Sequence, residues 1–465
     1  MKSVLWCITL LSIFILSVPS YGQIKLPAVI GDNMVLQQNS EVAIWGWGDP
    51  GSAIQVSGSW NKDTVKAMIS NQSVWKVKLK TPSAGGPFTV SIKGNEVVVL
   101  NNVMIGEVWI CSGQSNMEWS ADSKINNGEE EVKNATHPNI RFFHVKKLGS
   151  ETPQNNCFAR WETCTPETMH SFSAVGYFFG RNLQQNLNVP IGIIEVAWGG
   201  TPAEVWVRSD LVESDPLLKA CAVKLNTYDW WPSKSGVVYN GMIAPLLPYR
   251  IAGAIWYQGE SNANNPESYR KLFKTLIENW RHDFENDFPF YWVQIAPFTY
   301  GKEIRAPLIR EMQRQTMDVP KTGMVVVSDL VDNVKDIHPR NKQDVGKRLS
   351  YWALSETYGI KGLVYKNPLY QSMNPEKGKI RISFDNVKTG LKSTGDEISS
   401  FEIAGDDQVF KPAKVKIDGN TVLVWSKEVK TPVVVRFSFS NDAIGNLFSQ
   451  EGLPVAPFRT DDWKF

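Results

Sequence analysis

The central part of the chain alternates apolar runs with amphipathic segments, and this pattern constrains the fold more than any other feature. Apolar runs with few polar residues are typical of strands covered on both faces of a sheet. Their alternation with helical repeats predicts a mostly parallel sheet. The predicted strands are Val103–Cys111, Ile191–Ala197, Ile251–Gln258, Phe290–Ala296 and Gly323–Ser328. Residues 103–360 are therefore expected to form an α/β domain with its site at the carboxyl ends of these strands.

The helical repeats and the flanking segments complete the predicted architecture. The expected helices are Ser173–Leu187, Pro266–Trp280, Ile304–Met317 and Arg340–Tyr358, and Ile140–Val145 is a candidate additional strand. Residues 23–102 contain short alternating segments between turn residues, which predicts a small β-sandwich. Its expected strands are Glu41–Trp47, Ala53–Val56, Val74–Lys80, Phe88–Lys93 and Glu96–Leu100.

A β pattern returns over residues 361–465. Its candidate strands are Lys379–Phe384, Val415–Ile417, Thr421–Trp425 and Val433–Ser438. This segment is either a second β module or a part that joins the first one. A length of 465 residues agrees with two to three domains.

The first 22 residues resemble a secretory signal. Lys2 gives a positive start, an apolar run extends from Val4 to Leu16, and the small residues Ser20 and Gly22 precede a cleavage point. The alternative is a membrane anchor, but the run is short for a span. We expect a secreted or periplasmic mature protein with no membrane association after signal removal.

The net charge and the cysteines bear on three questions: nucleic-acid binding, disulfide formation and metal binding. The net charge is +2 without a basic block, so we expect no nucleic-acid partner. Cys157 and Cys164 are close enough in sequence to pair across a loop, although buried free thiols are the common alternative. No histidine or cysteine spacing is typical of a metal site, and neither a metal nor a cofactor is expected.

The segment Gly106-Glu-Val-Trp-Ile-Cys-Ser-Gly-Gln-Ser-Asn-Met-Glu-Trp119 contains the candidate nucleophile. A strand ends near Cys111, a tight turn follows, and Ser115 comes just beyond it. Its hydroxyl would lie at the carboxyl edge of the sheet, where the backbone N–H of Ser115 or Asn116 would face a developing oxyanion. The alternative is a serine that caps a helix. Ser112 is less suitable, since it lies nearer the buried strand.

A serine nucleophile needs a base, and the chain has only five histidines. His338 lies between the last predicted strand and a strong helix, where Pro339 suits a first helical turn. Asp336 is close enough to orient the imidazole and to stabilise its cation. The alternative is a loop histidine with a capping aspartate. The remaining histidines agree better with packing, surface or helix-end positions; they are His137, His144, His170 and His282.

Two more polar segments follow predicted strands. Gly199 and Gly200 follow the second strand, and paired glycines let backbone N–H groups approach a ligand. Gln258, Glu260 and Asn262 follow the third strand, where turn and cap roles are the alternative. If these segments meet Ser115 and His338 at one edge of the sheet, together they favour an active site for acyl transfer.

These motifs resemble the sialate O-acetylesterase family of the SGNH (GDSL-like) hydrolase superfamily. The nucleophile block includes Gln114 and Asn116 beside Ser115, a second block spans Trp256 to Ala263, and the last is Asp336-Ile-His-Pro. The resemblance implies a flavodoxin-like five-stranded sheet of order 2-1-3-4-5 and a metal-free ester hydrolysis without a cofactor.

The resemblance also implies roles for individual residues. Ser115 would attack an acetyl carbonyl and His338 would take its proton. The oxyanion would accept hydrogen bonds from the Ser115 and Gly200 N–H groups and from the Asn262 amide. Water would then release acetate from the acyl-enzyme.

Two departures from the superfamily pattern leave alternatives open. The spacing is Asp-x-His rather than Asp-x-x-His, so two alternatives to Asp336 are Asp332 as the third residue and a Ser–His dyad without one. The usual Gly-x-Asn spacing would place the asparagine at Ser261, so Gln258 or Glu260 is an alternative pocket residue.

Removal of the acetyl group follows the same chemistry for every sugar, so the catalytic residues do not identify which sugar carries it. The first expected substrate is 9-O-acetylated sialic acid, and the second is an acetylated polysaccharide such as xylan or pectin. A third hypothesis is a non-catalytic carbohydrate-binding protein, which the Ser–His pair disfavours. Aromatic side chains available for sugar stacking are Trp119, Trp198, Trp206, Trp230 and Trp231, although aromatic residues more often belong to the core.

Overall fold

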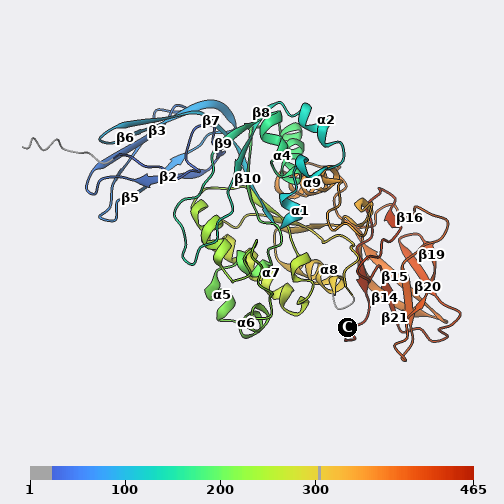
Figure 1. Cartoon of the computed structure of the whole chain (residues 1–465). Helices are drawn as coiled ribbons and strands as arrows, with labels where there is room; N and C mark the ends of the chain where they lie inside the picture. Colours follow the sequence, from blue (N-terminus) through green and yellow to red (C-terminus); the bar gives the residue numbers. More distant parts are fainter. Residues whose placement is uncertain (1–22, 302–304, 465) are drawn as a thin grey trace, which may run out of the picture.

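The protein has a mixed α/β centre between two β modules (Figure 1). The structure is a computed structural model that describes residues 23–301 and 305–464. The predicted signal peptide, residues 1–22, lies outside the described residues. Within the described ranges, no helix is both long enough and apolar enough to cross a bilayer.

The central sheet is mostly parallel. Its strands, in order across the sheet, are β13 (Thr322–Val325), β12 (Phe290–Val293), β11 (Gly253–Tyr257), β7 (Val97–Gly113), β10 (Ile191–Ala197), β8 (His137–His144) and β9 (Trp161–Cys164). The five predicted strands correspond to β7, β10, β11, β12 and β13, and they have the expected relative order. The sheet is larger than the five strands implied by the resemblance, because the candidate strand Ile140–Val145 forms β8 parallel to β10 and β9 pairs antiparallel with β8.

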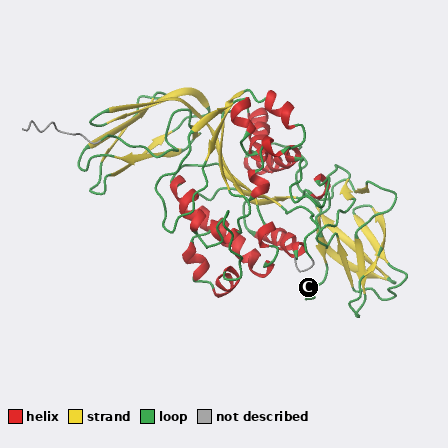
Figure 2. Cartoon of the chain, in the orientation of Figure 1, coloured by secondary structure: helices red, strands yellow, loops and turns green. Residues whose placement is uncertain are grey.

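Helices cover both faces of this sheet (Figure 2). The helices α4 (Ala174–Leu187) and α9 (Lys342–Trp352) pack together, and α7 (Tyr269–Asp283) packs with α8 (Ala306–Gln315). The shorter helices are α1 (Ser115–Glu118), α2 (Gly128–Lys133), α3 (Pro166–His170), α5 (Ser209–Glu213) and α6 (Pro216–Ala222).

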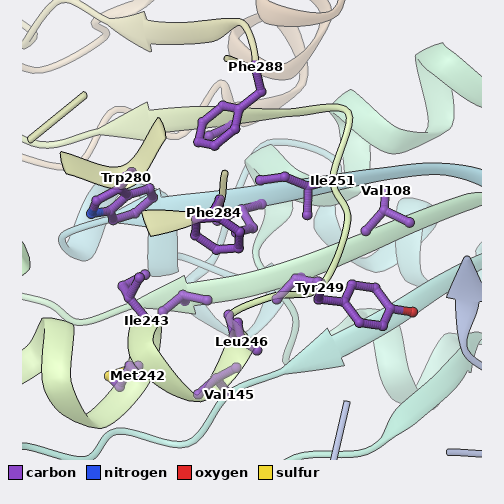
Figure 3. Close-up of a cluster of buried hydrophobic side chains, with 14 of the residues drawn as sticks. Val108, Val145, Met242, Ile243, Leu246, Tyr249, Ile251, Trp280, Phe284 and Phe288 are labelled. Carbon is purple, nitrogen blue, oxygen red and sulfur yellow. The ribbon is translucent and has the colours of Figure 1, made fainter. Parts of the chain in front are cut away.

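Successive residues of β7 enter different cores, because side chains alternate between the two faces of a strand. Val108 and Ile110 belong to the core that includes α7, whereas Trp109 and Cys111 belong to the core of α4 and α9. Figure 3 shows part of the first core, where Trp280 and other apolar side chains lie close to Val108 of β7. Burial on both faces explains why the sequence shows apolar runs instead of strict alternation.

Two of the predicted helices start or divide differently from expectation. The helix expected from Arg340 begins at Lys342 with Asn341 as its cap, so Pro339 lies before the helix and not in its first turn. The helix expected from Pro266 has a 3-10 turn at Pro266–Ser268 before α7 begins.

The N-terminal module is joined to the centre by β7, whose 17 residues replace the two separate strands expected at 96–100 and 103–111. One sheet of the module pairs β2 (Glu41–Trp47) with β5 (Val74–Lys80). The other strands are β1 (Val35–Gln37), β3 (Ala53–Gly58), β4 (Thr64–Met68) and β6 (Gly85–Lys93). They join the central sheet through β7, so the predicted boundary at 102/103 lies inside a continuous strand.

The C-terminal segment is a separate β module at the opposite end of the molecule (Figure 1). It has its own apolar core, so it does not join the first module. One sheet contains β14 (Leu369–Glu376), β15 (Lys379–Asp385), β20 (Thr421–Trp425) and β19 (Lys414–Asp418). The others contain β18 (Lys411–Pro412), β17 (Phe401–Ala404), β21 (Val434–Phe437) and β23 (Phe458–Arg459), and the pair β16 (Leu391–Ser393) and β22 (Leu447–Ser449).

The disulfide considered between Cys157 and Cys164 is absent from the structure. Both are buried free thiols, as are Cys111 and Cys221. Burial raises the pKa of the Cys157 and Cys164 thiols to about 12, so they remain protonated and behave as small apolar side chains.

Candidate active site

Ser115 is the first residue after the turn that ends β7. Gly113 has a φ of +139°, and a Cβ there would lie 2.2 Å from the carbonyl oxygen of Tyr257 on β11. Only glycine permits this close approach. The turn starts α1 at Ser115 and leaves its side chain half-buried.

The Ser115 hydroxyl meets the imidazole predicted as its base. Nε2 of His338 is 2.9 Å from Oγ of Ser115, which is within proton-transfer reach. The capping alternative for Ser115 is wrong, since Gln114 holds the N-cap position of α1 and no side chain caps that helix. The predicted meeting of hydroxyl and imidazole at one sheet edge is confirmed.

His338 lies in the loop before α9, between an aromatic ring and a carboxylate. The indole of Trp119 stacks on the imidazole with 4.5 Å between ring centroids. Asp336 Oδ1 is 3.6 Å from Nδ1 and accepts the backbone N–H of His338 at 2.9 Å. Asp332 is exposed, and no contact within the described residues connects it with His338. Of the two aspartates, Asp336 therefore has the position of an orienting group.

His338 is held in its neutral form. Burial and, to a smaller extent, the Lys342 cation lower its pKa to about 4, against the opposing effect of Asp336. A neutral imidazole at neutral pH can accept the proton of a hydroxyl. Each of the other histidines has a different partner: Tyr177 for His137, Glu195 for His144, Asp122 for His170 and Asp283 for His282.

A buried polar network lies directly behind the nucleophile. The Asn116 amide donates to Glu260 Oε1 at 2.6 Å and to the Ile337 carbonyl at 3.0 Å. Its oxygen accepts a bond from Lys342 Nζ at 2.6 Å. Asn116 thus ties the nucleophile turn to the loop that carries His338.

Lys342 was not found from the sequence, and it is almost completely buried at 1% exposure. Its ammonium group lies over the rings of Trp119 and Tyr257, 5.3 and 5.4 Å from their centroids. Burial lowers its pKa to about 7, against the opposing effects of Glu260 and Asp336. Lysine is almost never fully buried. Its position at the start of a predicted helix therefore gave no indication that Lys342 is part of the site.

The backbone of Gly199 and Gly200 lies beside Ser115. A Cβ on Gly199 would be 3.3 Å from the Ser115 Cβ, and Glu118 Oε2 accepts the Gly199 N–H at 2.6 Å. Gly200 has a φ of +82°. Within the described ranges, no hydrogen bond uses the N–H of Ser115 or of Gly200, so both donors are available.

The predicted polar residues after β11 divide into two groups. Glu260 lines a pocket, and burial raises its pKa. Gln258 and Asn262 are fully buried, with Gln258 donating to Asn262 Oδ1 at 2.7 Å. The Asn262 amide donates to Glu204 at 2.9 Å. Asn262 thus supports the loop from inside, and its predicted role as an oxyanion donor stays a prediction.

Gln114 also supports the site from behind. Its Oε1 accepts the N–H groups of Gly259 and Ser261 at 3.2 and 3.3 Å. Ser261 Oγ in turn donates to the Gly200 carbonyl at 2.9 Å. The three strand-end segments are therefore connected to one another by hydrogen bonds.

A pocket of about 270 Å³ lies next to this assembly. Its lining shares Gly200, Glu260 and Ser261 with the assembly, and it also includes Lys224, Tyr228 and Trp231. In the part of the chain that the structure describes, no group of three or more histidine, cysteine, aspartate or glutamate side chains is placed to hold a metal ion.

A parallel sheet with a serine–imidazole pair at its carboxyl edge is typical of serine hydrolases. Residues 105–354 match the model of the family described as carbohydrate esterase, sialic acid-specific acetylesterase. The chain is similar to sialate O-acetylesterase from Homo sapiens, with 33% identity over 405 residues that cover 77% of this chain and 76% of that one. The Mus musculus sialate O-acetylesterase is 31% identical over 435 residues, covering 78% and 79%.

A solved structure supports the same assignment. A carbohydrate acetylesterase from Xanthomonas citri is 37% identical, has a TM-score of 0.87, and is matched over 95% of this chain and 100% of its own. The chain belongs to the sialic acid-specific acetylesterase family of carbohydrate esterases.

Proposed function

We propose that this protein hydrolyses O-acetyl esters of sugars with Ser115 as nucleophile and His338 as general base. The observation that carries the proposal is the 2.9 Å contact between Ser115 Oγ and His338 Nε2. The relative order of β10, β7, β11, β12 and β13 supports a flavodoxin-like domain of the SGNH type.

In the first half of the reaction, Ser115 Oγ forms a bond to the acetyl carbonyl carbon and its proton passes to His338 Nε2. The carbonyl oxygen becomes an oxyanion that accepts hydrogen bonds from the Ser115 and Gly200 N–H groups. When the tetrahedral intermediate collapses, the bond to the sugar oxygen breaks and that oxygen receives the proton from His338. The sugar leaves and acetyl-Ser115 remains.

In the second half, a water molecule attacks the acetyl group and gives a proton to His338. Collapse of this intermediate breaks the bond to Ser115 Oγ, which takes the proton back from His338, and acetic acid leaves and gives its remaining proton to solvent as acetate. Asp336 orients the imidazole and stabilises its cation from the Nδ1 side.

Sialic acid with an O-acetyl group is the first proposed substrate. The family description and the names of the mammalian relatives support it. Its carboxylate needs a cation, and Lys224 lines the pocket beside Gly200. Lys224→Ala should therefore raise KM for acetylated sialic acid and leave KM for a neutral acetylated sugar unchanged.

An acetylated neutral polysaccharide is the second candidate. The similar Xanthomonas citri structure is described as a carbohydrate acetylesterase. The pocket also contains Glu260 and aromatic rings, which suit hydroxyl groups and sugar faces better than a carboxylate.

Two assays test the proposal. Ser115→Ala should abolish acetate release from p-nitrophenyl acetate while the thermal unfolding of the protein stays close to that of the wild type. Retained turnover would remove Ser115 from the mechanism. A panel of O-acetylated sialic acids and acetylated xylan oligomers then identifies the sugar through the ratio of kcat/KM values.

Export of the protein and its division at residues 22/23 and 360/361 are part of the same proposal, whereas the boundary predicted at 102/103 lies within the continuous strand β7. The apolar run from Val4 to Leu16 and the small residues after it support cleavage before a secreted or periplasmic mature chain. N-terminal sequencing of the protein exported from its native host tests the cleavage point.

A further inference from the structure

Two of the most exposed aromatic side chains of the protein lie together beside the proposed active site. Within the described residues, only Phe158, Tyr228 and Trp230 are large aromatic side chains classed as exposed, at 69%, 45% and 67%. Tyr228 and Trp230 belong to the loop between α6 and the helical turn Tyr239–Ile243. Contiguous exposed apolar patches mark interaction or ligand-binding sites, whereas a single exposed apolar residue needs no explanation.

The loop is anchored to the site through Trp231. A Cβ on Gly200 would lie 2.3 Å from the Trp231 ring, so the indole rests against the glycine whose N–H is a proposed oxyanion donor. Trp198, just before the two glycines, donates its indole N–H to the Trp230 carbonyl at 3.2 Å. The position of the loop is therefore fixed relative to Ser115.

The aromatic rings lead outward from the pocket. The Trp231 ring is 4.5 Å from that of Tyr228 and 5.9 Å from that of Trp230, measured between centroids. Trp231 and Tyr228 line the pocket, whereas Trp230 does not. We call Tyr228, Trp230 and Trp231 the aromatic loop.

The size of the pocket limits what it can hold. Its volume of about 270 Å³ is slightly below the range of roughly 300–1,000 Å³ that is usual for drug-sized ligands. One acetylated sugar ring suits this volume, and a second ring would extend beyond the rim. The exposed faces of Trp230 and Tyr228 offer that second ring an apolar surface, and aromatic rings lose little conformational entropy on binding.

We propose that the aromatic loop is a subsite for the sugar next to the acetylated one, so that the enzyme prefers an acetylated glycan chain to a free acetylated monosaccharide. This inference rests on the proposed esterase function. The acetylated unit occupies the pocket at Gly200, and its neighbour stacks on Trp230 and Tyr228. The subsite serves sialylated and neutral chains equally, because stacking uses the apolar face of the sugar.

The test compares short and long substrates in matched pairs. One pair is free 9-O-acetyl sialic acid and 9-O-acetylsialyllactose, and the other is acetylated xylose and acetylated xylohexaose. For the pair that the enzyme hydrolyses, wild-type KM should be about fivefold lower for the longer member. Trp230→Ala should remove this advantage, while turnover of p-nitrophenyl acetate and KM for the shorter member stay within about twofold.

Phe158→Ala is the matched control, because Phe158 is equally exposed and lies outside the aromatic loop and the pocket lining. It should leave all KM values unchanged. Equal wild-type KM values within a pair, or a Trp230→Ala effect of the same size on both members, would overturn the subsite while leaving the esterase function in place. Hydrolysis of p-nitrophenyl acetate without acetate release from any of the four sugars would overturn both.

Discussion

Replacement of Lys342 by methionine should shift the acid limb of the pH–rate profile to higher pH. Methionine has a similar length but no charge, so Lys342→Met removes the cation behind Trp119 and His338. That cation opposes protonation of the imidazole. Lys342 is mostly protonated below pH 6, since its own pKa is about 7, so its charge is present in the range near pH 4 in which His338 titrates.

The size of the shift follows from two stacked contacts. Lys342 Nζ is 5.3 Å from the centroid of the Trp119 ring, and that ring is 4.5 Å from the imidazole. The ammonium group is therefore within about 10 Å of the imidazole, where a unit charge at an effective dielectric constant of about 20 contributes about 1.7 kcal/mol. This energy corresponds to a rise of about 1.2 units in the pKa of His338 when the charge is removed.

The assay is kcat/KM for p-nitrophenyl acetate between pH 3 and 8, which reports the pKa of the base in the free enzyme. Lys347→Met is the matched control, because Lys347 lies on the same helix and is exposed. Its charge is screened by water and salt, so the expected shift is below about 0.3 unit. Identical acid limbs for the two variants, with both proteins folded, would refute the role given to Lys342.

Three further predictions concern the same machinery. The wild-type kcat/KM should remain level as pH falls through 6 and decline only near pH 4, because the lowered pKa of His338 keeps the base unprotonated; a decline near pH 6.5 would contradict that environment. Asp336→Asn should lower kcat by roughly 10³ to 10⁴-fold if the carboxylate stabilises the imidazolium, and near-normal rates in steady-state assays would indicate a Ser–His dyad. Gly113→Ala should lower stability by about 2 kcal/mol or more in thermal unfolding, because its Cβ would meet the Tyr257 carbonyl at 2.2 Å, whereas Gly149→Ala, at a position with open space, should have little effect.

The positions of Ser115 and His338 were predictable because both depend on chain-local signals. Each follows a strand of a parallel sheet, and the carboxyl ends of such strands share one edge. Placing each residue at a strand end was therefore enough to bring it to the site. The same reasoning located Gly200 and Glu260 without any knowledge of side-chain geometry.

The sequence predicted the wrong outcome where long-range packing decides the structure. The strands expected at 96–100 and 103–111 form one strand, because β6 pairs with β7 on both sides of Asn102, whose left-handed φ of 54° does not end the strand. The candidate strand Ile140–Val145 is confirmed as β8, but its place beside β10 depends on how an insertion folds back, which no local pattern records. Cys157 and Cys164 are close in sequence, but they are separate buried free thiols in the structure.

The buried network behind the nucleophile was beyond sequence reasoning for a different reason. Lys342 begins a helix, where lysine is usually solvated, and its burial is visible only once Trp119 and Tyr257 enclose it. Asn262 follows the strand as predicted, but its amide turns inward to Glu204. For both Lys342 and Asn262, the sequence gives the residue type and its place after a strand or at the start of a helix, but it does not predict the direction of the side chain.

Irreversible labelling with a fluorophosphonate tests the central contact most directly, since the reagent needs an activated serine and no particular sugar. Peptide mapping should place the label on Ser115 of the wild-type protein, and His338→Ala should slow the labelling by orders of magnitude. A label on another residue, or an undiminished rate without the imidazole, would contradict the account.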